Sequence, residues 1–313
     1  MIFLGMAVRH PQVFGSSENE IILAVSSLCH VLSLNCRVNN LLQIVNLWVL
    51  ESALNNPFPV KHIPARLLQQ LIVYHGADYE DEITSAMESV GPSIAAQTAM
   101  HQLSSILGTE SDYHFLEMRN ETLLIRMMIC TMRLSHPLLS NGVLRILIKT
   151  LSYATRESYT DDPATSGIMI WLVQNSCEAL QMAITSTTGV AMCRQALEFG
   201  ILAPLLRADK WHTHFTPAHF PNVPYIHARL LIQTLATYTI YPCVLRAAAI
   251  AIKQVPGKLQ ANLDKAGPMK KAWKQFKDVV QGRLQVPGAP AGPFDRLICS
   301  NLFVDVFSFR QFR

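Results

Sequence analysis

The densest cluster of side chains that could bind a metal ion is the segment WHTHFTPAH, residues 211–219. It contains His212, His214 and His219, and neutral imidazole is a good ligand for zinc and similar metals. No carboxylate nearby offers an obvious group to orient these ligands, Asp209 being the nearest. Because the segment is rich in proline and lies between expected helices, we interpret it as a surface loop with incidental histidines. A metal-dependent enzyme that uses the three histidines is the alternative.

A second candidate is a row of lysines that follows Gly267-Pro268. At helical spacing, Lys270, Lys274 and Lys277 share one face, and the opposite face is apolar: Met269, Trp273, Phe276, Val280 and Leu284. We expect the apolar face to cover the end of a helical array and the lysines to remain in water. The alternative is a basic adaptor for an acidic partner, anionic lipid or nucleic acid, of which nucleic acid is the least favoured because no aromatic stacking platform accompanies the lysines.

Motifs of the common enzyme classes are missing from the sequence. There is no Gly-rich phosphate loop, no HExxH, no GxSxG and no paired CxxC. Asp161-Asp162 stand in a turn-like context, and Cys193 stands in an apolar helical stretch, which is typical of an inert buried thiol. We therefore expect a protein that is not an enzyme, with no catalytic residue, no cofactor and no metal bound by this chain.

Composition narrows the class of protein further. Half of the 313 residues are hydrophobic and 15% are charged, which excludes a largely disordered chain. No apolar run reaches the ~18 residues of a membrane-spanning helix, and the N-terminus is a poor signal peptide. The seven cysteines are scattered and odd in number, which favours buried thiols in a reducing compartment. The expected location is the cytoplasm or the nucleus.

The net charge of +4 is unevenly distributed. Residues 246–285 carry nine Lys or Arg residues against two acidic ones, so the rest of the chain is slightly acidic. The positive excess therefore lies in one C-terminal segment.

The elements that must position these residues are helices. The stretch 225–255 reads as two apolar helices that are separated by Pro242, because proline cannot continue a helix and biases Tyr241 away from helical angles. Other helices are expected over residues 18–34, 39–54, 64–76, from Gly91-Pro92 to 107, and 120–135 with its end before Pro137. Residues 302–309 alternate like a strand and follow a Pro/Gly-rich linker.

A repeated pattern, G-[VI]-L-x-x-L, starts at Gly142 and again at Gly200. In both places glycine ends one helix and an apolar helix starts at once, as at the junctions of armadillo repeats. The spacing of 58 residues exceeds the ~40 to 47 of such repeats, and a polar insertion at residues 156–166 accounts for much of the difference. The pattern predicts an all-α, armadillo/HEAT-like α-solenoid, with a generic helical bundle as the competitor.

The C-terminal region resembles a family of mushroom-type fungal proteins, in which a helical, armadillo-like region precedes a MYND-type zinc finger. The residues that carry the resemblance are Leu245–Val255, Gly267, Pro268, Ala272, Trp273, Phe276, Lys277, Val280, Arg283 and Ile298–Asn301. It is best over residues 225–301 and looser over 140–206.

The sequence departs from that family after Cys299. The resemblance implies that Cys299 is the first ligand of the finger, yet no cysteine or histidine follows it here. One thiolate cannot form a four-ligand zinc site, so we expect the finger to be missing or truncated, although zinc is expected in full-length relatives.

These observations predict four segments: an irregular lead-in (1–16), an armadillo-like helical domain (17–255), a basic amphipathic capping helix (256–285), and a linker with an aberrant tail (286–313). The expected function is that of a scaffold for an unidentified protein or peptide. Lys270, Lys274 and Lys277 are the candidate partner-binding residues.

Overall fold

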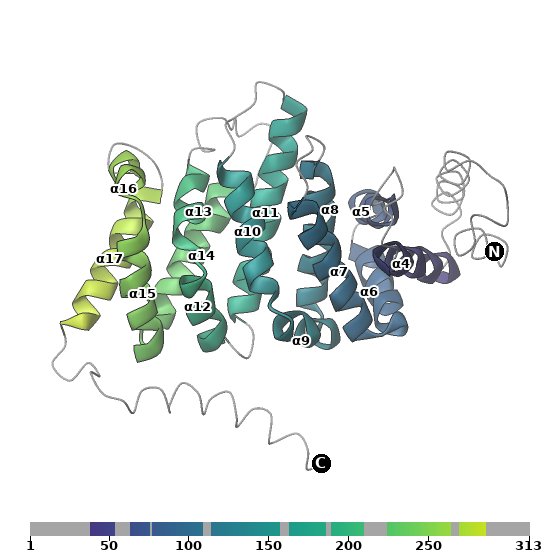
Figure 1. The fold of residues 1–313 in the computed structure, drawn as a ribbon, viewed down its shortest axis with the longest axis horizontal. Helices are drawn as coiled ribbons and strands as arrows, with labels where there is room; N and C mark the ends of the chain where they lie inside the picture. Colours follow the sequence, from purple (N-terminus) through teal and green to yellow (C-terminus); the bar gives the residue numbers. More distant parts are fainter. Residues whose placement is uncertain are drawn as a thin grey trace, which may run out of the picture. The chain divides into compact units, whose positions relative to one another are not determined.

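The computed structural model describes residues 38–53, 63–75, 77–108, 114–156, 163–185, 189–209, 224–263 and 269–285, and these residues form an all-α structure (Figure 1). Its helices are α4 (Val38–Ala53), α5 (Ile63–His75), α6 (Ala77–Val90), α7 (Pro92–Leu107), α8 (His114–Cys130), α9 (Met132–Ser140), α10 (Val143–Arg156), α11 (Pro163–Thr185), α12 (Gly189–Glu198), α13 (Leu202–Arg207), α14 (Pro224–Tyr238), α15 (Pro242–Gln254), α16 (Gly257–Leu263) and α17 (Met269–Leu284). The expected helix 18–34, the histidine segment 211–219 and the tail 286–313 with Cys299 lie outside the described residues.

The chain divides into two structural units. The first comprises residues 1–109 and 123–141, and the second comprises residues 110–122 and 142–313.

In the first unit, α4 supplies several buried apolar side chains. The side chains of Leu41, Ile44 and Trp48 are fully buried, and α4 packs against α5, α6 and α7. Burial of such side chains stabilises the fold by roughly 1.5–3 kcal/mol each. Helix α6 was not expected, because its sequence reads as an acidic stretch; its buried side chains, such as Ile83 and Met87, hold it against α4.

The segment that was expected to be one helix over 120–135 is two helices, α8 and α9. Thr131 separates them with an extended backbone (φ −98°, ψ 120°), and its carbonyl accepts a hydrogen bond from the amide of Ser135 at 2.8 Å. Pro137 lies inside α9 rather than after a helix end, so that prediction was wrong. Pro137 is the sixth residue of α9, so its ring removes the hydrogen bond that an amide there would donate to the carbonyl of Arg133.

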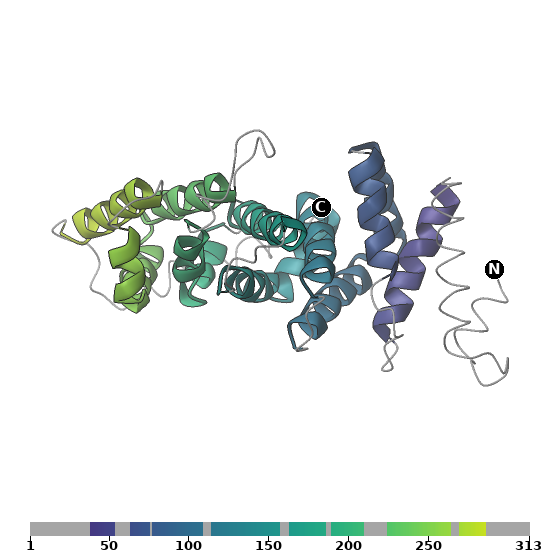
Figure 2. The same cartoon turned by 90° about the horizontal axis from the view of Figure 1, so that it is seen from above.

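The second unit is built from helices that stack in columns. Helices α11, α14 and α17 pack one on the next, and so do α10, α13 and α16. Helix α12 packs on α15 in the same way. Seen from above, α11, α14 and α17 form one row and the remaining helices of α10–α16 form a second layer (Figure 2). Each of α12, α13 and α14 thus packs against the helix three positions further along the chain, α15, α16 and α17 respectively.

The repeated glycines have the same backbone conformation. Gly142 and Gly200 both have φ of +81°, in the left-handed region that glycine adopts without strain. At Gly200 the turn is a Schellman motif: the amide of Ile201 bonds to the carbonyl of Ala196 at 3.2 Å, and that of Gly200 to Leu197 at 3.1 Å. The sequence pattern thus marks a real turn, which in the second occurrence joins α12 to α13.

The prolines also act as predicted. Pro224 and Pro242 are the first residues of α14 and α15, and Tyr241 between them is extended (φ −85°, ψ 125°). The two helices do not form a self-contained pair, however. The main packing partners of α14 are α11 and α17, and those of α15 are α12 and α17.

Candidate interaction surfaces

Two groups near the histidine segment in the sequence have other roles in the structure. The carboxylate of Asp209 lies at the N-terminus of α17, where its Oδ1 accepts a hydrogen bond from the amide of Met269 at 3.4 Å. The Nε2 atom of His227 lies 3.4 Å from Oε1 of Glu178, which also accepts a hydrogen bond from Gln174 at 2.9 Å. In the part of the chain that the structure describes, no three His, Cys, Asp or Glu side chains gather as metal ligands.

Cysteine chemistry is suppressed where the thiols are buried. Burial raises the pKa of Cys193 to about 12, and burial together with the nearby Glu178 raises the pKa of Cys177 as well. Both thiols therefore stay protonated near neutral pH, whereas a nucleophilic cysteine needs a lowered pKa. Cys130 is a free thiol that is exposed, and Cys243 is disulfide-bonded. Among the four cysteines that the structure describes, the expectation of buried thiols therefore holds for Cys177 and Cys193.

Helix α17 has the amphipathic arrangement that its sequence predicts. Met269, Trp273, Phe276 and Val280 are buried, and α17 packs against α14 and α15. Leu284 was expected on the same face but is 46% exposed, because it is the last residue of the helix. The rings of Trp273 and Phe276 stack with their centroids 5.8 Å apart.

The candidate lysines are not equivalent in the structure. Lys270, Lys271 and Lys274 are exposed, whereas Lys277 is half-buried, with its Nζ atom 5.5 Å from the ring centroid of Trp273. Such a distance is that of a cation–π interaction. The outer face of α17 is therefore cationic mainly through the other three residues.

Arg283 joins α17 to the end of α14. Its Nη1 atom donates a hydrogen bond to the carbonyl of Ala236 at 3.0 Å and another to the hydroxyl of Thr239. A guanidinium at a helix C-terminus satisfies carbonyls that have no partner in the helix and complements the helix dipole. A pocket of about 250 Å³ lies beside this contact, between α14 and α17.

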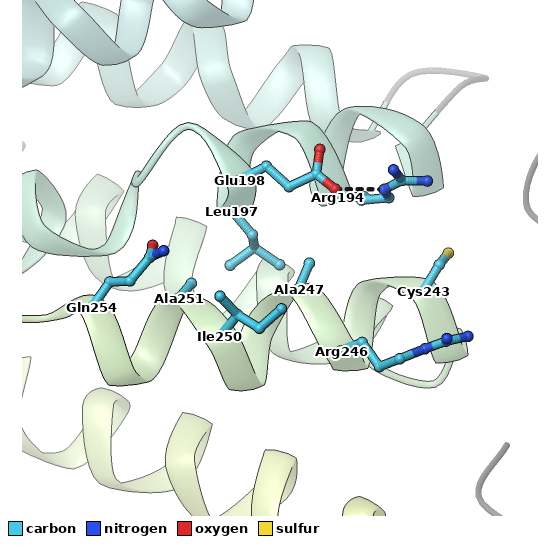
Figure 3. Close-up of a pocket in the computed structure, with 9 residues that line it drawn as sticks. All are labelled: Arg194, Leu197, Glu198, Cys243, Arg246, Ala247, Ile250, Ala251 and Gln254. Carbon is cyan, nitrogen blue, oxygen red and sulfur yellow. Dashed lines mark hydrogen bonds and ion pairs between the residues drawn. The ribbon is translucent and has the colours of Figure 1, made fainter. Parts of the chain in front are cut away.

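A larger pocket, of about 400 Å³, lies between α12 and α15 (Figure 3). We call it the α12–α15 groove; it is lined by Arg194, Leu197, Glu198, Cys243, Arg246, Ala247, Ile250, Ala251 and Gln254. Leu197, Ala247 and Ala251 are buried, whereas Ile250 is 59% exposed.

The charged groups of the groove come from both helices. On α12, Nε of Arg194 lies 2.7 Å from Oε1 of Glu198, one turn further along. On α15, Arg246 lies toward the same end of the groove as Arg194, and Gln254 lies at the opposite end (Figure 3). This groove was not predicted from the sequence, although Arg194 and Glu198 have the four-residue spacing of a helical ion pair.

No helix of the described residues is both long and apolar enough to cross a membrane. Comparison with known proteins finds no match: no family model matches the chain, and no curated protein and no solved structure is similar to it.

Proposed function

We propose that this chain is a protein-interaction scaffold without enzymatic activity, built as an armadillo/HEAT-like α-solenoid. The observation that supports this proposal is the packing of like helices in columns, α11 on α14 on α17 and α12 on α15. Stacked sets of this kind present a long surface of repeated helices, and solenoids use such surfaces to bind extended partners. The partner is an unidentified protein or peptide.

The structural roles of the residues that resemble the MYND-finger family support the solenoid part of this proposal. Trp273 and Phe276 are buried against the neighbouring helices, and Arg283 caps α14. The relationship to that family, with a missing finger after Cys299, remains part of the proposal. Genomic sequence downstream of the codons for Ile298–Asn301 tests it, since cysteine codons at finger spacing are expected there.

A basic adaptor is the second candidate, because Lys270, Lys271 and Lys274 are exposed on one helix. The alternative is a metal-dependent enzyme that uses His212, His214 and His219, which lie outside the described residues. Elemental analysis of the purified, untagged chain tests the enzyme directly. We expect less than one zinc ion per chain; a stoichiometric ion that is lost in a His212→Ala/His214→Ala variant would favour the enzyme instead.

Site-specific photo-crosslinking tests the scaffold. A photo-reactive amino acid is placed at Trp171 of α11, at Leu230 of α14 and, as a matched position of similar exposure in the first unit, at Ile94. We expect the same partner to be captured in extracts from both Trp171 and Leu230, because an extended partner contacts successive sets. Failure to capture any reproducible partner from these positions would contradict the scaffold.

A further inference from the structure

We propose that Arg156 and Arg207 form a binding site for the phosphoryl group of a phosphorylated serine or threonine in a peptide partner. This inference rests on the proposed scaffold function, and it names the chemistry of the partner and one place where the partner binds.

The two arginines come from helices that pack on each other. Arg156 is the last residue of α10, Arg207 is the last residue of α13, and α10 packs against α13. Both helices end on the same side of the second unit (Figure 1). The packing therefore brings two guanidinium groups from distant parts of the sequence to one end of a helix pair.

These guanidinium groups have no counter-ion in the part of the chain that the structure describes. Neither Arg156 nor Arg207 donates a side-chain hydrogen bond or forms an ion pair there, and Nη1 of Arg207 is buried without a hydrogen-bond partner. Asp209, two residues after Arg207, accepts a hydrogen bond from the amide of Met269 instead. Because buried N–H groups are normally hydrogen-bonded, an acceptor from outside these residues is expected beside Arg207.

The two positive charges also repel each other. Burial lowers the pKa of Arg207, and the nearby charge of Arg156 lowers it further, although the guanidinium stays protonated at neutral pH. Like charges that lie close together destabilise a fold, whereas an anion that binds both of them removes the repulsion. The pair is therefore complementary to a negatively charged group.

Capping of the two helices does not account for the pair. An arginine near the end of a helix can satisfy its last carbonyl groups, as Arg283 does for the carbonyl of Ala236 at the end of α14. Arg156 and Arg207 make no such hydrogen bond among the described residues, to their own helix or to the other one. Their donors therefore remain available to a ligand.

A phosphate monoester matches two guanidinium groups in charge and in geometry. It carries a charge of about −1.5 to −2 at neutral pH, and its three terminal oxygens can accept hydrogen bonds from both groups. A carboxylate has one negative charge, as has each phosphodiester of a nucleic acid, so either would leave one arginine uncompensated. The two charges of the site therefore favour a monoester.

A phosphorylated side chain fits the position of the site better than a free metabolite does. Arg156 is exposed, and neither arginine lines the pocket between α12 and α15 or the one between α14 and α17. Small molecules bind in concave pockets that enclose most of their surface, whereas a group on a peptide is also held by contacts along the peptide. Clusters of arginines recognise phosphorylated segments in this way.

The test applies the purified full chain to immobilised libraries of short degenerate peptides with a central phosphoserine or phosphothreonine, and to the same libraries without phosphate. We expect retention on the phosphorylated libraries only. The peptide that binds most tightly is then measured by fluorescence anisotropy, with inorganic phosphate and vesicles that contain a phosphatidylinositol phosphate as separate probes. The peptide should bind more tightly than either of them.

Three variants locate the site. Arg156→Gln and Arg207→Gln should each weaken binding of the phosphopeptide by about 10-fold or more, the usual effect of losing a hydrogen bond to a charged group. Arg145→Gln is the matched control, because it removes the same charge from an exposed arginine of α10 about three turns away from Arg156. It should leave the affinity nearly unchanged. Urea unfolding verifies that the variants fold, and the exposed Arg156 provides a variant that does not disturb the core.

Several outcomes would overturn the proposal: equal retention with and without phosphate, binding that survives both Arg156→Gln and Arg207→Gln, or an equal loss with Arg145→Gln. Tighter binding of the vesicles would assign the arginines to a membrane surface, and tighter binding of inorganic phosphate would assign them to a free anion. In each case the scaffold stands. Failure of the scaffold itself is measured independently, by the absence of crosslinked partners at Trp171 and Leu230.

Discussion

The ammonium group of Lys277 lies over the ring of Trp273, one turn earlier on α17, with 5.5 Å between Nζ and the ring centroid. The indole is buried, and its Nε1 has no hydrogen-bond partner among the described residues. Lys277 therefore covers part of the apolar face of α17 with its aliphatic stem while its charge remains near water. In this respect Lys277 differs from Lys270 and Lys274, which are exposed, although the helical spacing predicts all three on one face.

Replacement of the lysines by glutamine should reveal this difference. We expect Lys270→Gln and Lys274→Gln to change the free energy of unfolding by no more than about 0.5 kcal/mol each, as at ordinary surface sites. Lys277→Gln should cost about 0.5–1 kcal/mol, because the cation–π interaction is lost. Urea unfolding of the single variants measures these values, and equal effects at all three positions would contradict the structure.

Trp273→Ala should destabilise the protein strongly. The side chain is 1% exposed and packs with Phe276, so its removal leaves a cavity and should cost ~3–5 kcal/mol. Leu284→Ala, on the same helix but 46% exposed, is the control and should cost less than about 0.5 kcal/mol. A silent Trp273→Ala, measured by denaturant unfolding, would show that α17 does not cover the second unit.

Replacing glycine by alanine should have opposite effects on the free energy of unfolding at a glycine turn and within a helix. Gly200→Ala should cost roughly 1–2 kcal/mol, because φ is +81° there and a side chain disfavours left-handed angles. The cost is one of backbone conformation alone, since an added Cβ would meet no atom within 4 Å. Gly282→Ala, equally open but within α17, should instead stabilise by about 0.5–1 kcal/mol. Thermal unfolding of both variants tests the pair, and a stabilising Gly200→Ala would rule out the turn.

Buried thiols predict a loss of stability in mild base. The pKa of Cys193 is raised to about 12 and that of Cys177 is raised too, whereas an unfolded thiol ionises near a pKa of about 8.5. Above that pH the unfolded chain loses protons that the folded chain retains, so the free energy of unfolding falls by up to ~1.4 kcal/mol per pH unit for each thiol.

The measurement is urea unfolding between pH 8 and pH 10, compared with a Cys177→Ala/Cys193→Ala variant. The two alanines remove the titrating groups, so the variant should show a clearly shallower slope even if its absolute stability is lower. Identical slopes in the two proteins would mean that these thiols ionise in the folded state.

Single residues in the sequence were sufficient to predict where several helices begin and where two turns lie. Pro224 and Pro242 determine where α14 and α15 begin, and the glycines at 142 and 200 determine two turns, because each acts through its own backbone. Helix α6 could not be predicted from such single residues. Its acidic surface resembles a loop, and its few apolar residues stabilise a helix only once α4 lies against them.

The candidate sites depended even more on tertiary structure. The amphipathic pattern correctly separated the buried Trp273 from the exposed Lys270, since both lie on one helix. Arg194 and Arg246 both line the α12–α15 groove, although their helices are separated by more than 40 residues of sequence. The hydrophobic periodicity of a single helix does not show which distant helix packs against it.

The column packing of the second unit has an evolutionary consequence. Helix α14 packs against α17, and α11 packs against α14. The contact between α14 and α17 therefore corresponds to the contact between α11 and α14. Tandem duplication of the stretch that encodes α12–α14 would insert another set without demanding any new kind of junction. A lineage could thus lengthen its stack of helices by whole sets of three, while α17 and its buried indole keep their contacts with the preceding set.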